Sequence, residues 1–389
     1  MSTLMPTYGR LPVAFARGDG ALLYDTAGRA FLDGVSGIAV TNLGHCHPAI
    51  TAACIEQAQT LVHTSNLYHI PTQEELADKL VAATVFERAF FCNSGAEANE
   101  TAIKLARLYG YQRGIEQPQI IVLEGAFHGR TMGALSATGN SKIQEGFGPL
   151  LPGFIRVPRN DIAALEQATE NSHVVAILIE PVQGEGGVHL ISNEFMTAAR
   201  TLCDRHQWLL MFDEVQTGNG RCGALYAYQR LGVAPDVLVT AKGLGNGFPI
   251  GACLARGHAA SVLGPGDHGT TYGGNPLCCA VANAVISTLL EGELYARAEP
   301  IRAALLNAFQ AELDDAARVL DIRGLGLMIG IAPACRTDEL VRRGLEAGVL
   351  LNIAGGNTIR LLPPLVMTEM QAAELGHAIA TLINTTPLD

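Results

Sequence analysis

The sequence predicts an α/β protein with a mostly parallel sheet. Between about residues 76 and 255, short apolar runs alternate with helical patterns. The runs are continuous rather than alternating, which is typical of strands that helices cover on both faces. Two of these runs end in acidic residues, Glu180 and Asp213. Because ligands bind beyond the carboxyl ends of the strands in such sheets, we expect a ligand site at that edge.

The predicted elements follow in chain order, beginning with a hairpin of residues 20–25 and 28–33 around a Thr-Ala-Gly turn. The apolar runs of the sheet are residues 90–92, 120–123, 174–179, 209–212 and 237–239. Later residues predict helices at 277–290 and 301–313, an extended segment at 319–324 and a final helix at 369–383. We expect both chain ends (1–48 and 277–389) to form a smaller α+β domain beside a large domain of residues 49–276.

Size and composition exclude several classes of protein. With 389 residues and 48% hydrophobic content, the chain buries a substantial core. The net charge of -11 opposes binding to nucleic acid. Nine cysteines without a C-x-x-C pair predict reduced thiols. The apolar run at 278–282 meets Glu291 before it could cross a bilayer, and residues 1–6 lack the pattern of a signal peptide, so we expect a cytoplasmic protein without a membrane segment.

Asp213 and Lys242 together indicate a site for pyridoxal 5'-phosphate. Asp213 ends one apolar run, and Lys242 follows another and precedes a glycine-rich loop. A lysine amine can bond to the aldehyde of this cofactor, and a carboxylate can keep its pyridine nitrogen protonated. Val215 is expected to pack on one face of the ring, and Gln216 to donate to its 3-oxygen. Alone, such a lysine is usually a surface charge and such an aspartate a cap or ion-pair partner.

Residues 93–97 predict the start of a helix. Ser94 can be the N-cap, with Glu97 three residues on in a capping-box pattern. An ordinary helix start is the alternative interpretation of this pattern. The small residues Gly95 and Ala96 favour a phosphate cradle, because a phosphate needs bare backbone N–H groups at the positive end of a helix.

Two arginines are candidates for binding a substrate carboxylate. Arg130 follows Phe127, which could stack on the cofactor ring, although a surface ion pair and a core phenylalanine are the alternatives. Arg360 lies inside an apolar run, so it either pairs with a protein carboxylate or binds that of a ligand. His45 and His47 suggest a metal site, but no second ligand cluster follows at zinc spacing. We therefore expect no metal, and favour a turn that begins a helix.

Five motifs resemble those of the class III pyridoxal-phosphate aminotransferases, and the resemblance extends over nearly the whole chain. They are residues 93–99 (Asn-Ser-Gly-Ala-Glu-Ala-Asn), 127–130 (Phe-His-Gly-Arg), 180–186 (Glu-Pro-Val-Gln-Gly-Glu-Gly), 213–216 (Asp-Glu-Val-Gln) and 241–243 (Ala-Lys-Gly). The resemblance implies fold type I, with a seven-stranded-type sheet in the large domain. It also implies a homodimer whose subunits share their active sites.

The resemblance assigns roles to single residues. The cofactor would be bound by Ser94, Gly95, Ala96, Phe127, Asp213, Glu214, Val215, Gln216 and Lys242, with Thr271 reaching the phosphate of the other subunit. Asp213 and Lys242 would be catalytic. Arg130 and Thr270 would contact an acylated substrate. Arg360 would bind the α-carboxylate of 2-oxoglutarate, and Glu185 resembles the residue that neutralises this arginine in related ornithine aminotransferases.

The implied reaction moves the terminal amino group of N-acetylornithine to 2-oxoglutarate, in arginine biosynthesis. N-succinylornithine, ornithine and 4-aminobutyrate remain alternative amines, because the sequence does not reveal the shape of the acyl pocket. Intact Lys242 and Asp213 argue against an inactive regulatory protein, and the missing dinucleotide fingerprint argues against a nicotinamide dehydrogenase. The chain departs from the family pattern at Asn219, Asn246, Thr270 and Tyr272. These departures put only fine substrate preference in doubt.

Overall fold

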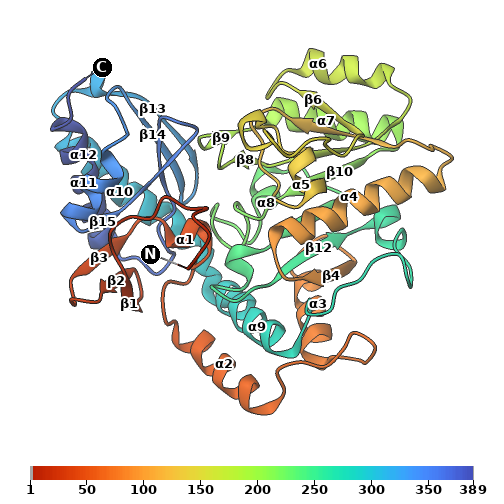
Figure 1. The fold of residues 1–389 in the computed structure, drawn as a ribbon, viewed down its shortest axis with the longest axis horizontal. Coiled ribbons are helices and arrows are strands. Elements are labelled where there is room, and N and C mark those ends of the chain that lie inside the picture. Colours follow the sequence, from red (N-terminus) through yellow and green to blue (C-terminus); the bar gives the residue numbers. More distant parts are fainter. Residues whose placement is uncertain (1–2, 389) are drawn as a thin grey trace.

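A seven-stranded sheet forms the centre of the larger part of the molecule in Figure 1, a computed structural model that describes residues 3–388. Its strands lie in the order β4-β12-β11-β10-β7-β5-β6. Their bounds are β4 Arg88–Cys92, β5 Gln119–Leu123, β6 Phe154–Val157, β7 Val174–Ile179, β10 Leu209–Asp213, β11 Val237–Thr240 and β12 Gly251–Ala255. Strand β12 is antiparallel to β4 and β11, and the other neighbouring pairs are parallel. The predicted mostly parallel α/β sheet is confirmed.

All five predicted runs are strands of this sheet, whereas β6 and β12 were not predicted. Strand β6 lies at the edge, and its residues are mostly half-buried or exposed, so it lacks a continuous apolar run. Strand β12 is fully buried, but it begins Gly-Ala-Cys. Small residues give a weak strand signal because they contribute little packing surface.

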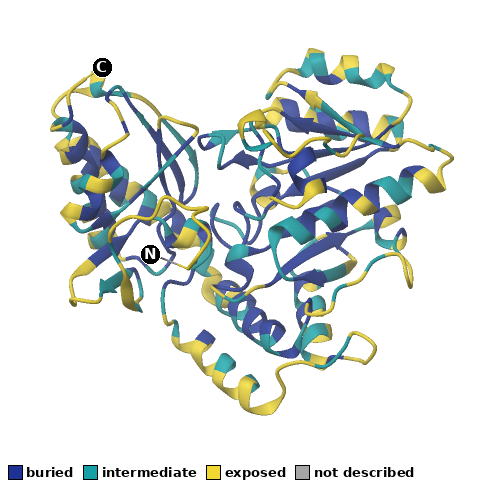
Figure 2. Cartoon of the chain, viewed as in Figure 1, coloured by how far each residue is buried: buried dark blue, intermediate teal, exposed yellow. Residues whose placement is uncertain are grey.

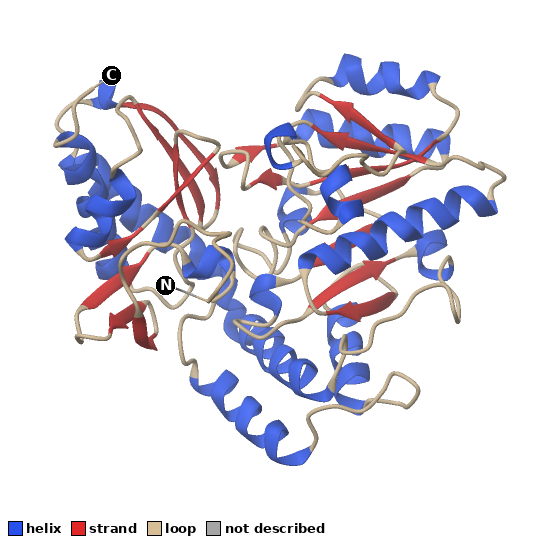
Figure 3. Cartoon of the chain, in the orientation of Figure 1, coloured by secondary structure: helices blue, strands red, loops and turns tan. Residues whose placement is uncertain are grey.

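Helices cover both faces of the sheet (Figure 3). Helix α4 (Gly95–Gln112) packs on β11 and β12, and α7 (Asn193–His206) packs on β7 and β10. Strand β7 divides its side chains between two cores: Ile177 and Ile179 join the cluster that contains Phe195 of α7. Ala176 and Leu178 join the cluster on the α4 face. Because successive side chains of a strand point to opposite faces, a strand covered on both sides must be apolar throughout.

The remaining helices of this part are α2 (Pro48–Thr60), α3 (Pro71–Ala82), α5 (Met132–Ala137), α6 (Ile162–Gln167), α8 (Ala227–Leu231) and α9 (Pro276–Leu290). Figure 2 shows that α2 is largely exposed and that the central strands are buried. Among the described residues, one helical stretch, Pro276–Glu312, is apolar and long enough to cross a membrane by composition. Positive φ angles at Gly292 and Glu293 break this stretch, and α9 packs on α2 and α3, so we interpret α9 as a core helix.

Two smaller sheets lie at the other side of the molecule. One has the order β1-β2-β3-β15, with β1 Phe15–Asp19, β2 Leu22–Asp25, β3 Ala30–Asp33 and β15 Val349–Leu350. The other has the order β13-β14-β17-β16, with β13 Val319–Leu325, β14 Met328–Pro333, β16 Asn352–Ala354 and β17 Thr358–Leu361. Helices α10 (Ala298–Glu312), α11 (Leu340–Ala347) and α12 (Glu369–Asn384) accompany them.

The first of these sheets joins the two ends of the chain. Strands β2 and β3 form the predicted antiparallel hairpin. Strand β15, far along the chain, pairs parallel with β3. The predicted later elements also form, since α9, α10, β13 and α12 cover the expected segments. The ends of the chain therefore meet, while the exact domain limits at 48 and 276 stay a prediction.

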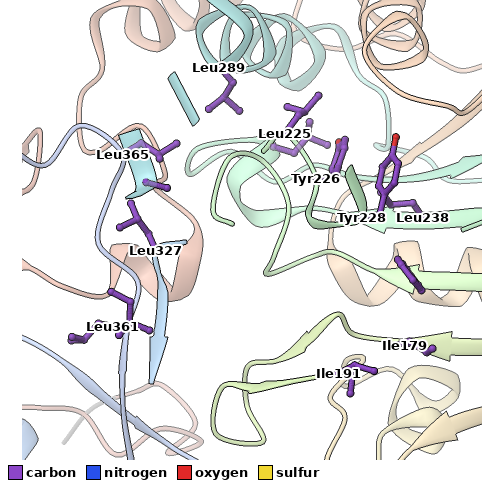
Figure 4. Packing of buried hydrophobic residues seen from close by; sticks show 14 of the residues in the cluster. Ile179, Ile191, Leu225, Tyr226, Tyr228, Leu238, Leu289, Leu327, Leu361 and Leu365 are labelled. Carbon is purple, nitrogen blue, oxygen red and sulfur yellow. The ribbon is translucent and has the colours of Figure 1, made fainter. Parts of the chain in front are cut away.

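One apolar cluster continues from the large sheet into the C-terminal segment. Figure 4 shows Ile179 and Leu238 on the side of the large sheet, and Leu327, Leu361 and Leu365 on the other side. All five belong to the same buried cluster. This shared core fixes the position of β17, which carries Arg360, relative to β10, which carries Asp213.

Short irregular segments complete the chain. Helix α1 (Ser36–Ala39) is a left-handed turn, with φ angles of 50° at Ser36 and 66° at Ile38. The hairpin β8 (Val182–Gln183) and β9 (His189–Leu190) follows β7. Short 3-10 helices occur at η1 Ser141–Ile143, η2 Ala168–Glu170, η3 Lys242–Leu244, η4 Gly257–Ser261, η5 Glu291–Arg297 and η6 Ala316–Arg318.

Candidate active site

A cavity of about 430 Å³ opens at the carboxyl ends of β10 and β11, where a ligand site was expected. Its wall includes the predicted residues Ser94, Gly95, Ala96, Phe127, Arg130, Asp213, Val215, Gln216 and Lys242. The other lining residues are Val40, Asn93, Asn99, His128, Gly129, Glu180, Ala241 and residues 247–250. Segments that are distant in the sequence therefore meet around one space.

The N-terminus of α4 forms one wall of the cavity. Ser94 is the N-cap, because its Oγ accepts a hydrogen bond from the Glu97 N–H at 3.2 Å. The Glu97 carboxylate does not return to the N–H of Ser94, as a capping box requires. It accepts instead from the backbone and side chain of Asn93, at 2.5 and 2.9 Å. The predicted cap is present, and the second half of the box is shifted by one residue.

Gly95 leaves this wall bare. An added Cβ would lie 2.7 Å from Val215 Cγ1 and 2.9 Å from Cγ2. The first N–H groups of a helix have no partner within the helix, and the helix dipole makes this end positive. Gly95 and Ala96 supply such groups at the cavity. The geometry therefore suits a phosphate group, and no side chain blocks access to it.

Asp213 is held rigidly at the end of β10. Its Oδ2 accepts from Asn99 Nδ2 and lies within hydrogen-bond distance of His128 Nδ1, both at 2.8 Å. Its Oδ1 accepts from the Val215 N–H at 3.0 Å. Only 4% of Asp213 is exposed. With Oδ2 shared by two partners, Oδ1 keeps a lone pair for a further donor, such as a protonated ring nitrogen.

Glu180 is a second buried carboxylate beside Asp213. Its Oε1 accepts from the Phe127 N–H at 2.7 Å. Burial raises the pKa of Glu180 well above its usual value, and the neighbouring charge of Asp213 raises this pKa further. The proton therefore resides on Glu180 more readily than on an exposed glutamate, which lessens the repulsion between the two carboxyl groups.

Lys242 also lines the cavity, two residues after the end of β11. It is partly buried, and its desolvation lowers the pKa of its amine, against an opposing effect of Glu185. Its φ angle of 46° is uncommon for a residue with a side chain. Such strain is often found at functional positions, where the surrounding structure must hold it. The amine is thus confined to the cavity with a lowered affinity for its proton.

Two asparagines fix the backbone around Lys242. Asn219 Nδ2 donates to Thr240 Oγ1 at 2.9 Å and to the Ala241 carbonyl at 3.1 Å. Asn246 Oδ1 accepts from the Leu43 N–H at 2.9 Å, and its Nδ2 donates to a carbonyl of the same N-terminal segment. Both asparagines have positive φ angles, which this residue type tolerates. These departures from the family pattern therefore support the loop that carries the lysine.

Arg360 pairs with Glu185, as the resemblance implied. Arg360 Nη1 lies 2.5 Å from Glu185 Oε1, and it also donates to Gln216 Oε1 at 3.3 Å. The opposite edge of the guanidinium donates twice to Asn352 Oδ1, which was not predicted. The arginine is 1% exposed, whereas the Glu185 side chain is 37% exposed. Neither Arg360 nor Glu185 lines the cavity, and Gln216 connects them to it.

Arg130 is a cation at the rim of the cavity. It is exposed, and its guanidinium carbon lies 5.8 Å from the centre of the Phe127 ring. Among the described residues, no carboxylate forms an ion pair with it. An anionic group in the cavity could therefore reach this arginine without displacing a protein partner.

Thr270 and Thr271 lie in a loop that does not line the cavity. Thr270 Oγ1 accepts from the Gly273 N–H at 3.1 Å and from Asn93 Nδ2 at 3.4 Å. Asn93 does line the cavity, so Thr270 is one residue removed from it. Thr271 and Tyr272 are exposed. Within one chain, none of the three loop residues touches the space around Lys242.

Glu214 was predicted to bind the cofactor, and its position contradicts this. Its carboxylate is fully buried and accepts from the Ala227 N–H at 2.6 Å and the Tyr228 N–H at 2.9 Å. These groups begin α8, so Glu214 caps that helix. Adjacent side chains of an extended segment point in opposite directions, and Asp213 already points into the cavity. Glu214 therefore points away from it.

The two histidines near residue 46, His45 and His47, have structural roles. His45 Nε2 lies 2.8 Å from Asp33 Oδ2, and His47 is the residue before α2. Among residues 3–388, no group of three or more histidine, cysteine or carboxylate side chains has the arrangement of a metal site. The turn that begins a helix, which we favoured from sequence, is present.

Comparisons with known proteins agree with this geometry. A family model described as aminotransferase class-III matches residues 4–383. The chain is 50% identical to the acetylornithine aminotransferase of Nitrosomonas europaea over 384 residues, which is 98% of each protein. An ornithine aminotransferase structure from Toxoplasma gondii superposes with a TM-score of 0.94 at 33% identity, covering 98% of this chain and 92% of that one. An N-acetylornithine aminotransferase structure from Stenotrophomonas maltophilia gives 0.85 at 36% identity, covering 97% and 96%. The chain therefore belongs to the class-III aminotransferases, a pyridoxal phosphate-dependent family of enzymes.

Proposed function

We propose that this aminotransferase moves the terminal amino group of N-acetylornithine to 2-oxoglutarate, giving N-acetylglutamate 5-semialdehyde and glutamate in arginine biosynthesis. The observation that carries the proposal is one cavity whose wall includes both Lys242 and Asp213. Arg360 lies next to this cavity, and among the described residues it is paired only with a half-exposed glutamate and neutral groups. The 50% identity to an acetylornithine aminotransferase supports the choice of amine.

The residues around the cavity suit pyridoxal 5'-phosphate. Its protonated ring would withdraw electrons from the substrate carbon that loses a proton. The N–H groups of Gly95 and Ala96 would hold the phosphate beside the Ser94 cap. Asp213 Oδ1 would accept from the ring nitrogen. Phe127 and Val215 would enclose the ring, and Gln216 Nε2 would donate to the 3-oxygen, since Gln216 Oε1 already faces Arg360.

Lys242 Nζ would move the proton. Its pKa is lowered by burial, so the neutral amine is more accessible than in an exposed lysine. In that form Nζ would accept the proton from the amine-bearing carbon of the substrate and pass it to the cofactor within the first half-reaction, and it would move a proton in the opposite direction in the second.

Arg360 would serve the two substrates differently. While the amine substrate is bound, Glu185 neutralises Arg360, and no strong carboxylate site is open there. When 2-oxoglutarate enters, its α-carboxylate replaces Glu185 on Nη1, and Glu185 turns toward solvent. The Glu185 side chain is 37% exposed, so water can solvate its carboxylate after it leaves Arg360, which makes this exchange easier.

Arg130 and Thr270 would recognise the acylated end of the amine. Arg130 lies at the rim without an ion-pair partner among the described residues and can bind a carboxylate. Thr270 is connected to the cavity through Asn93. Ornithine is a second candidate substrate, because an ornithine aminotransferase structure superposes with a TM-score of 0.94.

We also propose a cytoplasmic homodimer with shared active sites. Leu67, Tyr68 and Tyr272 are 86%, 68% and 65% exposed. They lie in two neighbouring segments, since Asn66 Nδ2 donates to the carbonyls of Thr270 and Gly273. An apolar surface of this kind is typical of a protein interface. A second copy on this surface would allow Thr271 to reach the partner's cofactor phosphate.

The substrate assignment is tested by adding each amine separately to the yellow holoenzyme. We expect N-acetylornithine to bleach the visible band fastest, and 2-oxoglutarate to restore it. Faster bleaching with ornithine, N-succinylornithine or 4-aminobutyrate would replace the proposed amine by that one. If none of the four amines bleaches the visible band, transamination is contradicted.

A further inference from the structure

One edge of the Arg360 guanidinium is held by a neutral side chain. Asn352 Oδ1 accepts from Arg360 Nε at 3.0 Å and from Nη2 at 2.7 Å. The two residues face each other on neighbouring antiparallel strands, β16 and β17. The pairing of these strands therefore sets the distance between the amide and the guanidinium.

The other edge of the guanidinium has the exchangeable partner. Nη1 lies next to Glu185 Oε1 at 2.5 Å and Gln216 Oε1 at 3.3 Å. Glu185 lies between β8 and β9 and is 37% exposed, whereas the arginine is 1% exposed. A guanidinium has five N–H donors in one plane, so fixing the Nε edge fixes the direction of Nη1 as well.

We propose that Asn352 is a positioning residue for the dicarboxylate half-reaction. It keeps the Nη1 side of Arg360 directed toward Glu185 or toward the incoming carboxylate, while Glu185 leaves and returns. This inference rests on the proposed function, because it assigns a constant partner to the arginine that would bind 2-oxoglutarate.

The neutrality of Asn352 is part of the argument. An amide oxygen orients the guanidinium without cancelling its charge, so the full attraction remains for a carboxylate on the other edge. An aspartate at this position would add a second anion close to Glu185 and to the substrate carboxylate. An alanine would leave two N–H donors of a buried arginine without their acceptor, and the side chain could then turn toward other partners.

The test uses the holoenzyme and glutarate, a five-carbon dicarboxylate that lacks the reactive carbonyl group. Calorimetry measures its dissociation constant for the wild type, Asn352→Asp and Asn352→Ala. The matched control is Asn357→Asp, the same change at an exposed position of the loop between β16 and β17. In parallel, the rate of bleaching by the preferred amine measures the first half-reaction.

We expect glutarate to bind about tenfold more weakly or worse to both Asn352 variants, as for the loss of a hydrogen bond to a charged group. Asn357→Asp should stay within about twofold of the wild type, as expected for a surface change. The first half-reaction should change much less than glutarate binding in all variants, because Glu185 still covers Arg360 there. Thermal unfolding identifies a variant that does not fold. Glutarate binding to the other Asn352 variant then tests the inference.

Unchanged glutarate binding in a folded Asn352 variant would overturn the inference. So would an equal loss in the amine half-reaction, because that result indicates general structural damage. If the wild type is bleached by no amine, the proposed function fails instead. The two failures are therefore distinguishable.

Discussion

Glu185→Gln is predicted to act oppositely on the two half-reactions. The change removes the only carboxylate that pairs with Arg360 among the described residues. An ion pair with one exposed partner contributes about 1 kcal/mol, because solvent screens it. The Glu185 side chain is 37% exposed, so this discount applies. Removal of the competing anion should therefore strengthen binding of 2-oxoglutarate by about fivefold.

The amine half-reaction should become slower in the same variant. Arg360 would keep its charge without an anionic partner and would repel the substrate ammonium near the cavity. Stopped-flow absorbance at varied concentrations of each substrate separates the two effects. Glu194→Gln, at the first turn of α7 away from the cavity, is the control. Weaker or unchanged binding of 2-oxoglutarate, together with an unaffected amine half-reaction, would refute the exchange of carboxylates on Arg360.

Two further predictions concern the support of the site. Gly95→Ala places a Cβ 2.7 Å from Val215 Cγ1. We expect a cost of about 1–3 kcal/mol and weaker cofactor binding in an absorbance titration, with Gly9→Ala as a control in open space. Burial raises the pKa of Glu214 to about 7 from 4.5. Its contribution to the free energy of unfolding is therefore full below about pH 4.5 and is lost as the pH rises through about 7. In urea unfolding across this pH range, the wild type should lose about 3 kcal/mol of stability that the Glu214→Gln variant does not lose. An identical pH profile for the variant and the wild type would contradict the assignment.

The sequence was most informative where the local pattern and the tertiary environment agree. Strands such as β7 are apolar throughout because two cores cover them, and these strands were predicted. Strand β6 was missed because it lies at an edge, and β12 because it begins with small residues. The pairing of β15 with β3 joins residues 349 and 32, and no local pattern reports such a contact.

The same distinction applies to the site. Asp213 ends one strong apolar run and Lys242 closely follows another, so their position at the sheet edge could be inferred. The hydrogen bonds of Asn99 and His128 to Asp213, and of Asn352 to Arg360, were not predicted. Each joins two residues that are distant in the sequence or lie on neighbouring strands. Asn99 and His128 belong to motifs that were noted, so a search for side chains near a strand-end carboxylate could have found them.

Glu214 shows the opposite error. A neighbour of a catalytic residue in a motif was assumed to share its role. The alternation of side chains along the extended segment places it instead at the start of α8. Motif membership therefore predicts the location of a residue better than the direction of its side chain.

The most direct test of the central claim is to find which lysine carries the cofactor. The lysines of the chain are Lys79, Lys104, Lys142 and Lys242. Borohydride reduction of the holoenzyme, followed by digestion and mass spectrometry, fixes the cofactor to its lysine. The account predicts the added pyridoxyl mass on Lys242, and none on any lysine in the Lys242→Ala variant. The added mass on another lysine, or cofactor retained without a covalent link to any lysine, would contradict the account.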